Sequence, residues 1–208
     1  MRRFIVIGRD ATASGDFSLD DLPGSSGRLD VLLRCVRAAL LVSHGVRRDT
    51  AIYLVLGGGP LAPRAIRVDG ATSEYLRPDE RSLAGMIRNL LGRPRREVGA
   101  GFGPSTRGIA IAEAGLDAVL ADLGPCTPYV LEEGAADLRA APLDLEHGAF
   151  FLGDHHGFDE TTRARLAGLG AVAIAIGPTS VHADDVVAIV ANELDRRLAA
   201  RSQSCAGA

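Results

Sequence analysis

The feature that most constrains the fold is a repeated alternation of short apolar runs with segments of helical periodicity. Arg3–Gly8, Thr50–Leu56 and Ala171–Ile176 are apolar runs of strand length. From Leu29 onward, apolar residues recur every three or four positions, which predicts a helix that ends near Gly45. Strands that alternate with helices predict an α/β domain with a largely parallel sheet, covered by helices on both faces.

The rest of the chain continues this alternation, with a loop rich in glycine, proline and arginine expected over Arg93–Arg107. No internal repeat or interdomain linker is evident, so we expect one domain over residues 1–200 and a flexible tail over 201–208. The remaining expected strands are Ala65–Val68, Gly108–Ala112, Pro128–Leu131 and Ala149–Leu152, and the remaining helices are Pro78–Gly92, Leu116–Leu123, Asp159–Ala167 and Val181–Leu198.

Composition indicates a soluble cytoplasmic protein. Hydrophobic residues make up 47% of the 208 positions, enough for a buried core, yet no apolar run approaches the roughly 18–20 residues that span a membrane. The N-terminus lacks the longer apolar region of a signal peptide. The three cysteines form no CxxC pair, which argues against a disulfide framework and a structural zinc site.

The formal net charge of -3 does not identify a nucleic-acid-binding protein. Binding depends on local patches rather than on the sum of charges. All 23 basic residues are arginine, a side chain suited to bidentate contacts with phosphates and bases. Composition alone therefore leaves RNA binding open.

Three loops that follow expected strands are candidates for a ligand site, because ligands of α/β sheets bind beyond the carboxyl ends of the strands. They are Leu131–Gly134, Gly153–Gly157 and Ile176–Val181. Their glycines allow the backbone to approach a flat ligand such as adenine. Ordinary strand–helix turns also use glycine, so spacing alone does not decide between the two interpretations.

Familiar cofactor motifs are absent. Gly99–Gly103 lacks the GxGxxG spacing, no helix opens after Gly57–Pro60, and the chain has no Walker A or GxSxG sequence. A conventional NAD or ATP site is therefore not expected. The adjacent His155 and His156 have no carboxylate or cysteine partner at metal-ligand spacing, so no metal is expected either.

A second candidate site lies at the start of the helix expected from Leu29. Arg28 and Asp30 flank its first residue, and Arg34 lies about one turn further along. Such a cluster could clamp a phosphate or a base while its carboxylate orients or deprotonates the base. The alternative is a solvated helix face with ion pairs.

Taken together, several stretches resemble the archaeal tRNA pseudouridine-54 N1-methyltransferases, the TrmY type of the SPOUT class. The resemblance follows the same order over nearly the whole chain. The stretches that carry it are Gly24–Asp30, Arg34–Val36, Ser43–Asp49, Pro78–Arg81, Phe151–His155, Pro178–Ala183 and Asn192–Asp195.

The resemblance implies a SPOUT fold with a C-terminal trefoil knot, a homodimer, and S-adenosylmethionine as the methyl donor. Two positions depart from the archaeal pattern: Val186 replaces a cysteine, and Asp184-Asp185 replace Asn-His. Carried over by position, the donor contacts are Leu131, Gly153, Ile176, Gly177, Pro178, Thr179, Ser180, Val181 and Val186.

The implied reaction is methylation of N1 of pseudouridine in RNA, with tRNA position 54 as the expected target. N1 of pseudouridine carries a weakly acidic hydrogen, so the nitrogen attacks the methyl group as that proton leaves. We expect Arg28 to hold the target nucleotide, Arg34 to assist, and Asp30 to orient or deprotonate it, with Asp49 and Asp154 as other candidates for the base.

Three alternatives remain open from sequence. The same chemistry could act on a pseudouridine of ribosomal RNA or on the free nucleoside. A protein that kept the scaffold could bind RNA without catalysis.

Overall fold

The centre of the molecule is a seven-stranded sheet. The structure is a computed structural model, and it describes residues 1–94 and 97–206. The strand order is β6-β5-β4-β1-β8-β7-β9, and β2 and β3 form a separate hairpin. The strands are β1 Arg2–Thr12, β2 Leu41–Val42, β3 Gly45–Val46, β4 Thr50–Gly58, β5 Arg64–Asp69, β6 Ile109–Ala112, β7 Thr127–Asp137, β8 Gly148–Gly153 and β9 Val172–Ala175.

Five adjacent strands of the sheet are parallel. β4, β1, β8, β7 and β9 run in one direction, and β5 and β6 are antiparallel additions at one edge. The expected α/β fold with a mostly parallel sheet is confirmed. The carboxyl ends of the five parallel strands therefore meet at one end of the molecule, where a ligand site is expected.

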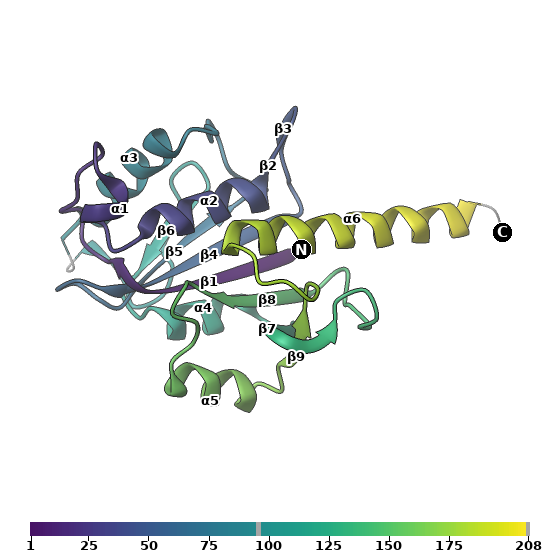
Figure 1. The fold of residues 1–208 in the computed structure, drawn as a ribbon. Helices are drawn as coiled ribbons and strands as arrows, with labels where there is room; N and C mark the ends of the chain where they lie inside the picture. Colours follow the sequence, from purple (N-terminus) through teal and green to yellow (C-terminus); the bar gives the residue numbers. More distant parts are fainter. Residues whose placement is uncertain (95–96, 207–208) are drawn as a thin grey trace.

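Helices cover both faces of this sheet (Figure 1). Phe4 and Val6 of β1 pack under α2, α3 and α6, whereas Ile5 and Ile7 face α4 and α5 on the other side. This alternation is typical of a parallel strand that is buried on both faces. The helices are α1 Leu22–Ser25, α2 Leu29–Leu40, α3 Glu80–Leu91, α4 Leu116–Leu123, α5 Glu160–Gly168 and α6 Ala183–Ala206.

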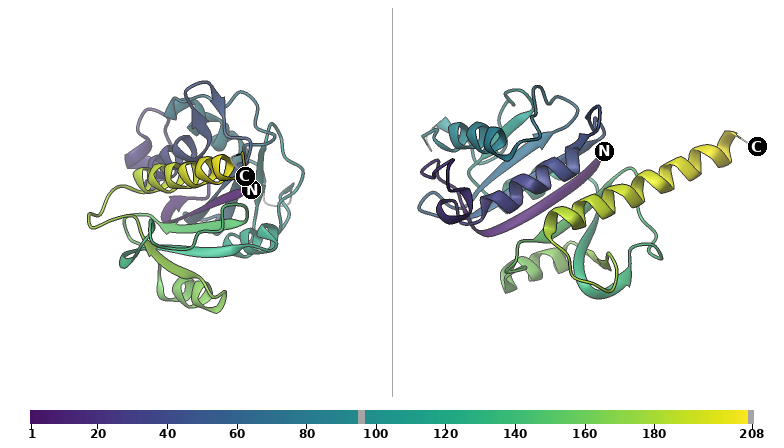
Figure 2. Two further views of the ribbon diagram at one scale, coloured as in Figure 1. Left: turned by 90° about the vertical axis from the view of Figure 1, so that its right-hand side faces the viewer. Right: turned by 45° about the horizontal axis from the view of Figure 1, so that its top comes forward.

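The helix α2 is the most deeply buried helix near the candidate site. It lies beside α6, as the right-hand view of Figure 2 shows, and also packs on β1, β4 and α3. Leu29, Leu32 and Leu33 are each fully buried, and burial of one such side chain contributes about 1.5–3 kcal/mol. This packing fixes the position of the polar residues that α2 also carries.

The end of α2 differs from the sequence prediction. The helix ends at Leu40 rather than near Gly45, because Leu41 takes an extended conformation with φ −91° and ψ 131°. Leu41 then pairs with Val46 in the β2–β3 hairpin. The short helix α1 lies outside all of the helices expected from the sequence.

The strand β7 is longer than predicted. It continues through the expected loop Leu131–Gly134 to Asp137. Both Leu131 and Ala136 pair with Ile174 of β9, so residues 132–135 leave the ladder as a bulged segment. The predicted ligand loop is therefore an interruption within a strand rather than the end of one.

The C-terminal residues differ as well. The expected tail continues α6 as helix to Ala206 (Figure 1), because the sequence from Ala183 to Ala206 contains neither glycine nor proline to end it. Residues 207–208 of that tail lie outside the described residues, as do Arg95 and Arg96 of the expected Arg93–Arg107 loop. Within the described ranges, no helix combines the length and apolarity required to cross a membrane.

Candidate functional site

The expected Arg28, Asp30 and Arg34 form one ion-pair cluster at the start of α2. Asp30 Oδ1 accepts a hydrogen bond from Arg28 Nε at 3.0 Å, and its Oδ2 accepts from Arg28 Nη2 at 3.1 Å and from Arg34 Nη1 at 3.0 Å. The Asp30 side chain is 2% exposed, whereas those of Arg28 and Arg34 are 45% and 35% exposed. A buried carboxylate thus holds two arginines that remain accessible to a ligand.

The start of α2 is docked closely against the end of β1. Thr12 N donates to Ser26 O at 3.0 Å, and a Cβ atom on Gly27 would lie 1.9 Å from Asp10 O. Arg28 itself is left-handed, with φ 66°, a conformation that costs an arginine about 1–3 kcal/mol. The fold therefore maintains a strained arginine at this position.

The environment of Asp30 makes it a weak base. Burial alone would raise the pKa of Asp30, but the hydrogen bonds and charges of Arg28 and Arg34 outweigh this effect, so the pKa lies below its ordinary value. A carboxylate of this kind stays ionised at neutral pH and has little tendency to take a proton. The geometry favours the orienting role of Asp30 over the deprotonating one.

The loop after β8 is fastened to the end of β1. Asp154 is 8% exposed and accepts hydrogen bonds from Arg9 N at 2.8 Å and His156 N at 2.9 Å. A Cβ atom on Gly153 would lie 2.8 Å from the backbone of Gly157. Gly153 therefore serves the close packing of the turn, and Asp154 holds the turn in place.

The bulge of β7 and the loop between β9 and α6 are joined by side chains. Ser180 Oγ donates to Glu133 Oε1 at 2.6 Å, and Glu132 pairs with Arg163 of α5. A Cβ atom on Gly177 would meet nothing within 4 Å, so the backbone there is open to a ligand. Among the expected donor contacts, Leu131, Ile176 and Val186 are partly buried against the core, Gly177 is partly buried, and Pro178, Thr179, Ser180 and Val181 are exposed.

Asp184 joins the two predicted sites. It lies in the first turn of α6, directly after the β9–α6 loop, and its Oδ1 is 3.7 Å from Arg34 Nε. Asp184 Oδ1 is buried and has no hydrogen-bond partner among the described residues. The structure therefore brings the arginine cluster and the end of the β9–α6 loop together at the carboxyl ends of the parallel strands.

Asp49, one of the alternative bases, lies elsewhere. It precedes the first residue of β4 and pairs with Arg2 at 3.1 Å, at the opposite end of the sheet from Arg28. The structure separates it from the other predicted site residues.

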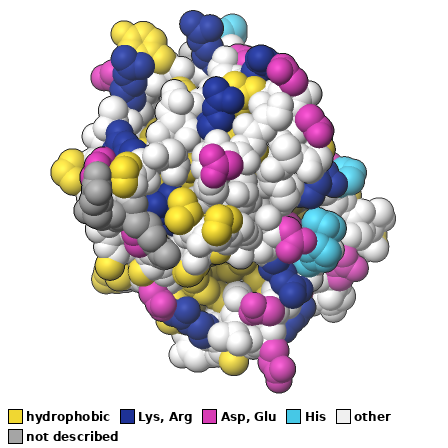
Figure 3. Space-filling model, turned by 90° about the vertical axis from the view of Figure 1, so that its left-hand side faces the viewer, with side chains coloured by type: hydrophobic (Ala, Val, Ile, Leu, Met, Phe, Trp, Pro, Cys, Tyr) yellow, Lys and Arg dark blue, Asp and Glu magenta, His cyan; other side chains and the backbone are white. Residues whose placement is uncertain are grey.

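The surface at the carboxyl end carries mixed charge (Figure 3). Arginine side chains alternate there with acidic ones, and His156 Nε2 lies 2.9 Å from Asp10 Oδ2. An anionic ligand at this end would therefore meet individual arginines rather than one continuous basic surface.

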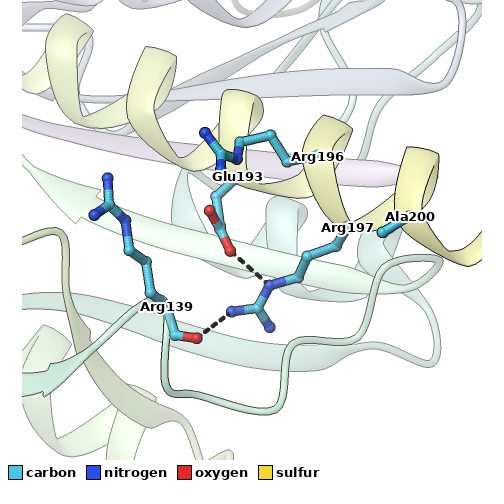
Figure 4. A pocket seen from close by; sticks show the side chains of 5 residues that line it. All are labelled: Arg139, Glu193, Arg196, Arg197 and Ala200. Atoms are coloured by element: carbon cyan, nitrogen blue, oxygen red, sulfur yellow. Dashed lines mark hydrogen bonds and ion pairs between the residues drawn. The ribbon is translucent and has the colours of Figure 1, made fainter.

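A groove of about 260 Å³ runs along α6 next to the start of the β9–α6 loop. It adjoins a second hollow of about 350 Å³ in which Arg197 pairs with Glu193 and donates to Arg139 O (Figure 4). The groove reaches Ile176 but not the arginine cluster. Its lining residues are Leu138, Arg139, Ile176, Ala188, Ile189, Asn192, Glu193 and Arg196.

Within the part of the chain that the structure describes, no three histidine, cysteine or acidic side chains gather in a way that could hold a metal ion. The rings of His155 and His156 lie against each other at an interplanar angle of 40°, with centroids 3.9 Å apart.

Sequence reasoning did not predict the contacts that join the loops. Asp184 was noted only as a departure from the archaeal pattern, and neither Asp10 nor Glu133 was assigned a role. Their proximity to Arg34, His156 and Ser180 arises from tertiary structure. The one usable signal was the position of Asp184 immediately after a candidate loop.

Comparison with known proteins defines the class. Residues 1–199 match the family model described as "Putative SAM-dependent RNA methyltransferase", and the chain belongs to this family. Within it, the chain is 39% identical over 203 residues to the tRNA (pseudouridine(54)-N(1))-methyltransferase of Methanosarcina acetivorans, covering 98% of this chain and 95% of the relative.

Two further proteins extend the comparison. The tRNA (pseudouridine(54)-N(1))-methyltransferase of Halobacterium salinarum is 40% identical over 195 residues, which cover 94% of this chain and 96% of the relative. The fold is similar to that of Archaeoglobus fulgidus Nep1 bound to S-adenosylhomocysteine, with a TM-score of 0.63 and 16% identity over 95% of this chain and 98% of the other. The expected family is confirmed, and the likeness to Nep1 supports a SPOUT fold.

Proposed function

We propose that this protein transfers a methyl group from S-adenosylmethionine to N1 of pseudouridine 54 in tRNA. One structural observation carries the proposal: Asp184 and Arg34 bring the β9–α6 loop next to the arginine cluster of α2. The full-length likeness to relatives of that name supports the choice of substrate.

The donor is assigned to the bulge of β7, the end of β8 and the β9–α6 loop. When bound, S-adenosylmethionine supplies an electrophilic methyl group on a sulfonium. The open backbone at Gly177 fits a flat adenine, and the partly buried Leu131, Ile176 and Val186 supply apolar walls. The link between Ser180 and Glu133 keeps two of these loops together.

The target nucleotide is assigned to the accessible faces of Arg28 and Arg34. Their guanidinium groups would stabilise the negative charge that develops on the uracil ring as the N1 proton leaves. Asp30 orients both arginines in advance. Because its pKa lies below the ordinary value, we assign proton acceptance to water rather than to Asp30.

We further propose that the protein is a homodimer whose contact includes the groove along α6. Ile189 is 37% exposed in this groove. A twofold-symmetric contact would bring the groove residues Arg139 and Arg196 of one copy to Glu193 of the other. A copy seated there would cover Ile176 and help to close the donor site.

The proposal also includes the C-terminal trefoil knot, formed where the chain from β9 to α6 passes the connection between β7 and β8. Arg197 of α6 donates to the carbonyl oxygens of Leu138, Arg139 and Ala141 in that connection, which supports a close association. We place the reaction in the cytoplasm, where a tRNA substrate is found.

The experiment that tests the function measures transfer of labelled methyl groups to two tRNAs that differ only at position 54. We expect the tRNA with pseudouridine 54 to accept about one methyl group and the tRNA with uridine 54 to accept none. Equal transfer to both tRNAs, or transfer to ribosomal RNA or free pseudouridine instead, would contradict the proposal.

The donor site is tested by equilibrium dialysis of S-adenosylmethionine. Val186→Trp places a larger side chain in the wall of the proposed site, where it would occupy the space of the donor, and should abolish binding. Ser202→Trp, on the projecting part of α6, should leave binding unchanged. Unaltered binding in a folded Val186→Trp variant would place the donor elsewhere.

A further inference from the structure

Tyr75 has an unusual environment for an aromatic side chain. It is 76% exposed, the largest value among the exposed large hydrophobic side chains of the described residues. The other two tyrosines, Tyr53 and Tyr129, are 3% and 2% exposed. The guanidinium carbon of Arg107 lies over the Tyr75 ring, 5.5 Å from its centroid, so the ring is supported from one direction and largely open to solvent.

Both residues of this pair have left-handed backbones. Tyr75 has φ 57° and Arg107 has φ 53°, and the third such residue outside glycine in the described chain is Arg28 of the candidate active site. A left-handed residue of this kind costs about 1–3 kcal/mol and persists only where the surrounding structure imposes it.

The loop that carries Tyr75 is anchored on both sides. Arg48 donates hydrogen bonds to Gly70 O and Ser73 O, both at 2.9 Å, and Ser73 Oγ donates to Asp69 O at 2.6 Å. Asp69 N donates to Gly108 O at 2.8 Å, which joins this loop to the segment that carries Arg107. The exposed ring is therefore held in place in advance.

This pair lies at the end of the sheet opposite the candidate active site. Asp69, at the end of β5, pairs with Ala51 near the start of β4. The strand β4 is nine residues long and runs from there toward the other end, roughly 30 Å in all. A duplex stem of about five base pairs is at most about 17 Å long. An RNA that contacts both ends must extend beyond such a stem.

We propose that Tyr75, backed by Arg107, is an accessory site that stacks one unpaired nucleobase of the tRNA substrate outside the T-arm. The proposal rests on the proposed function, because it assumes an RNA substrate. Aromatic rings and arginine planes are the groups on which proteins stack splayed bases. Since the acidic Glu74 is adjacent to Tyr75, this site favours the neutral face of a base over a phosphate.

The test compares intact tRNA with a T-arm hairpin, both carrying pseudouridine 54. Tyr75→Ala should weaken binding of intact tRNA by about five- to a hundredfold, the range for loss of one stacked base, and leave methylation of the hairpin unchanged. Tyr75→Trp should restore the affinity. Because stacking releases few counterions, the salt dependence of binding should stay the same in all three proteins.

Tyr75→Trp also provides a direct signal, since the chain has no other tryptophan. We expect intact tRNA to quench its fluorescence and the hairpin to leave it unchanged. Equal affinity of Tyr75→Ala and the wild type for intact tRNA would overturn the proposal, as would a change in oligomeric state without a change in RNA affinity. If the wild type methylates neither RNA, the proposed function itself fails.

Discussion

At the scale of single residues, the role of Asp30 decides how the proposed reaction handles charge. Two arginines occupy both of its oxygens and lower its pKa. A carboxylate that is already ionised cannot make the rate depend on pH at pH values above the ordinary pKa of aspartate. Asp30 therefore acts through the arginines that it orients.

We predict that Asp30→Asn lowers kcat/KM about 10- to 100-fold, because Arg28 and Arg34 lose their fixed geometry. The shape of the pH profile between pH 5 and 8 should not change, since a carboxylate with a lowered pKa stays ionised throughout this range. Its lower limit, pH 5, is already about one pH unit above the ordinary pKa of an aspartate carboxyl. The measurement is kcat/KM against pH for both proteins. If the wild-type rate falls at acidic pH and this dependence disappears in Asp30→Asn, Asp30 is the base after all.

At the scale of elements, the contact between β1 and α2 positions the cluster. Gly27 has φ 59° and lies against the backbone of Asp10. We predict that Gly27→Ala lowers the free energy of unfolding by about 1–3 kcal/mol and reduces methylation, because any added atom displaces Arg28.

The matched control for that variant is Gly168→Ala. Gly168 ends α5, and a Cβ atom there would meet nothing within 4 Å. Alanine should stabilise the helix by up to about 1 kcal/mol and leave activity unchanged. Chemical denaturation gives the free energy of unfolding of both variants. A Gly27→Ala protein that is as stable and active as the control would contradict the role of the close contact between Gly27 and the backbone of Asp10.

Elements were more predictable than the contacts between them. The helix Leu116–Leu123 was predicted with the bounds that the structure gives, because its apolar spacing and flanking glycines are local signals. The end of α2 was missed, since Leu41 and Val46 form a hairpin in place of another helical turn. The bulge of β7 was also missed, because it depends on pairing with Ile174 of a strand about 40 positions later.

The candidate site was predictable in part for the same reason. Arg28, Asp30 and Arg34 are close in sequence, so helical spacing alone indicates a cluster. Asp184 lies 150 positions beyond Arg34 (184 − 34), and only the folded chain brings them together. The three ligand loops were selected by their place after expected strands, and only the resemblance to known enzymes assigned them to the proposed donor site, because periodicity did not distinguish them from ordinary turns.

At the scale of the whole molecule, we predict that Ile189→Glu converts the proposed dimer into a monomer. A carboxylate placed at a twofold contact faces its own copy and loses hydration. Sedimentation equilibrium measures the change, and methylation should fall as the dimer dissociates. A wild-type protein that is monomeric at all concentrations would contradict this part of the account.

The central claim is tested most directly by identifying the product nucleoside. Intact tRNA with pseudouridine 54 is incubated with the protein and S-adenosylmethionine whose methyl group carries deuterium, and the nucleosides and the oligonucleotide that contains position 54 are analysed by mass spectrometry. The account predicts the label in N1-methylpseudouridine at position 54, and its loss in Arg28→Ala. Label in another nucleoside or position, or no label from a folded protein that binds the donor, would contradict it.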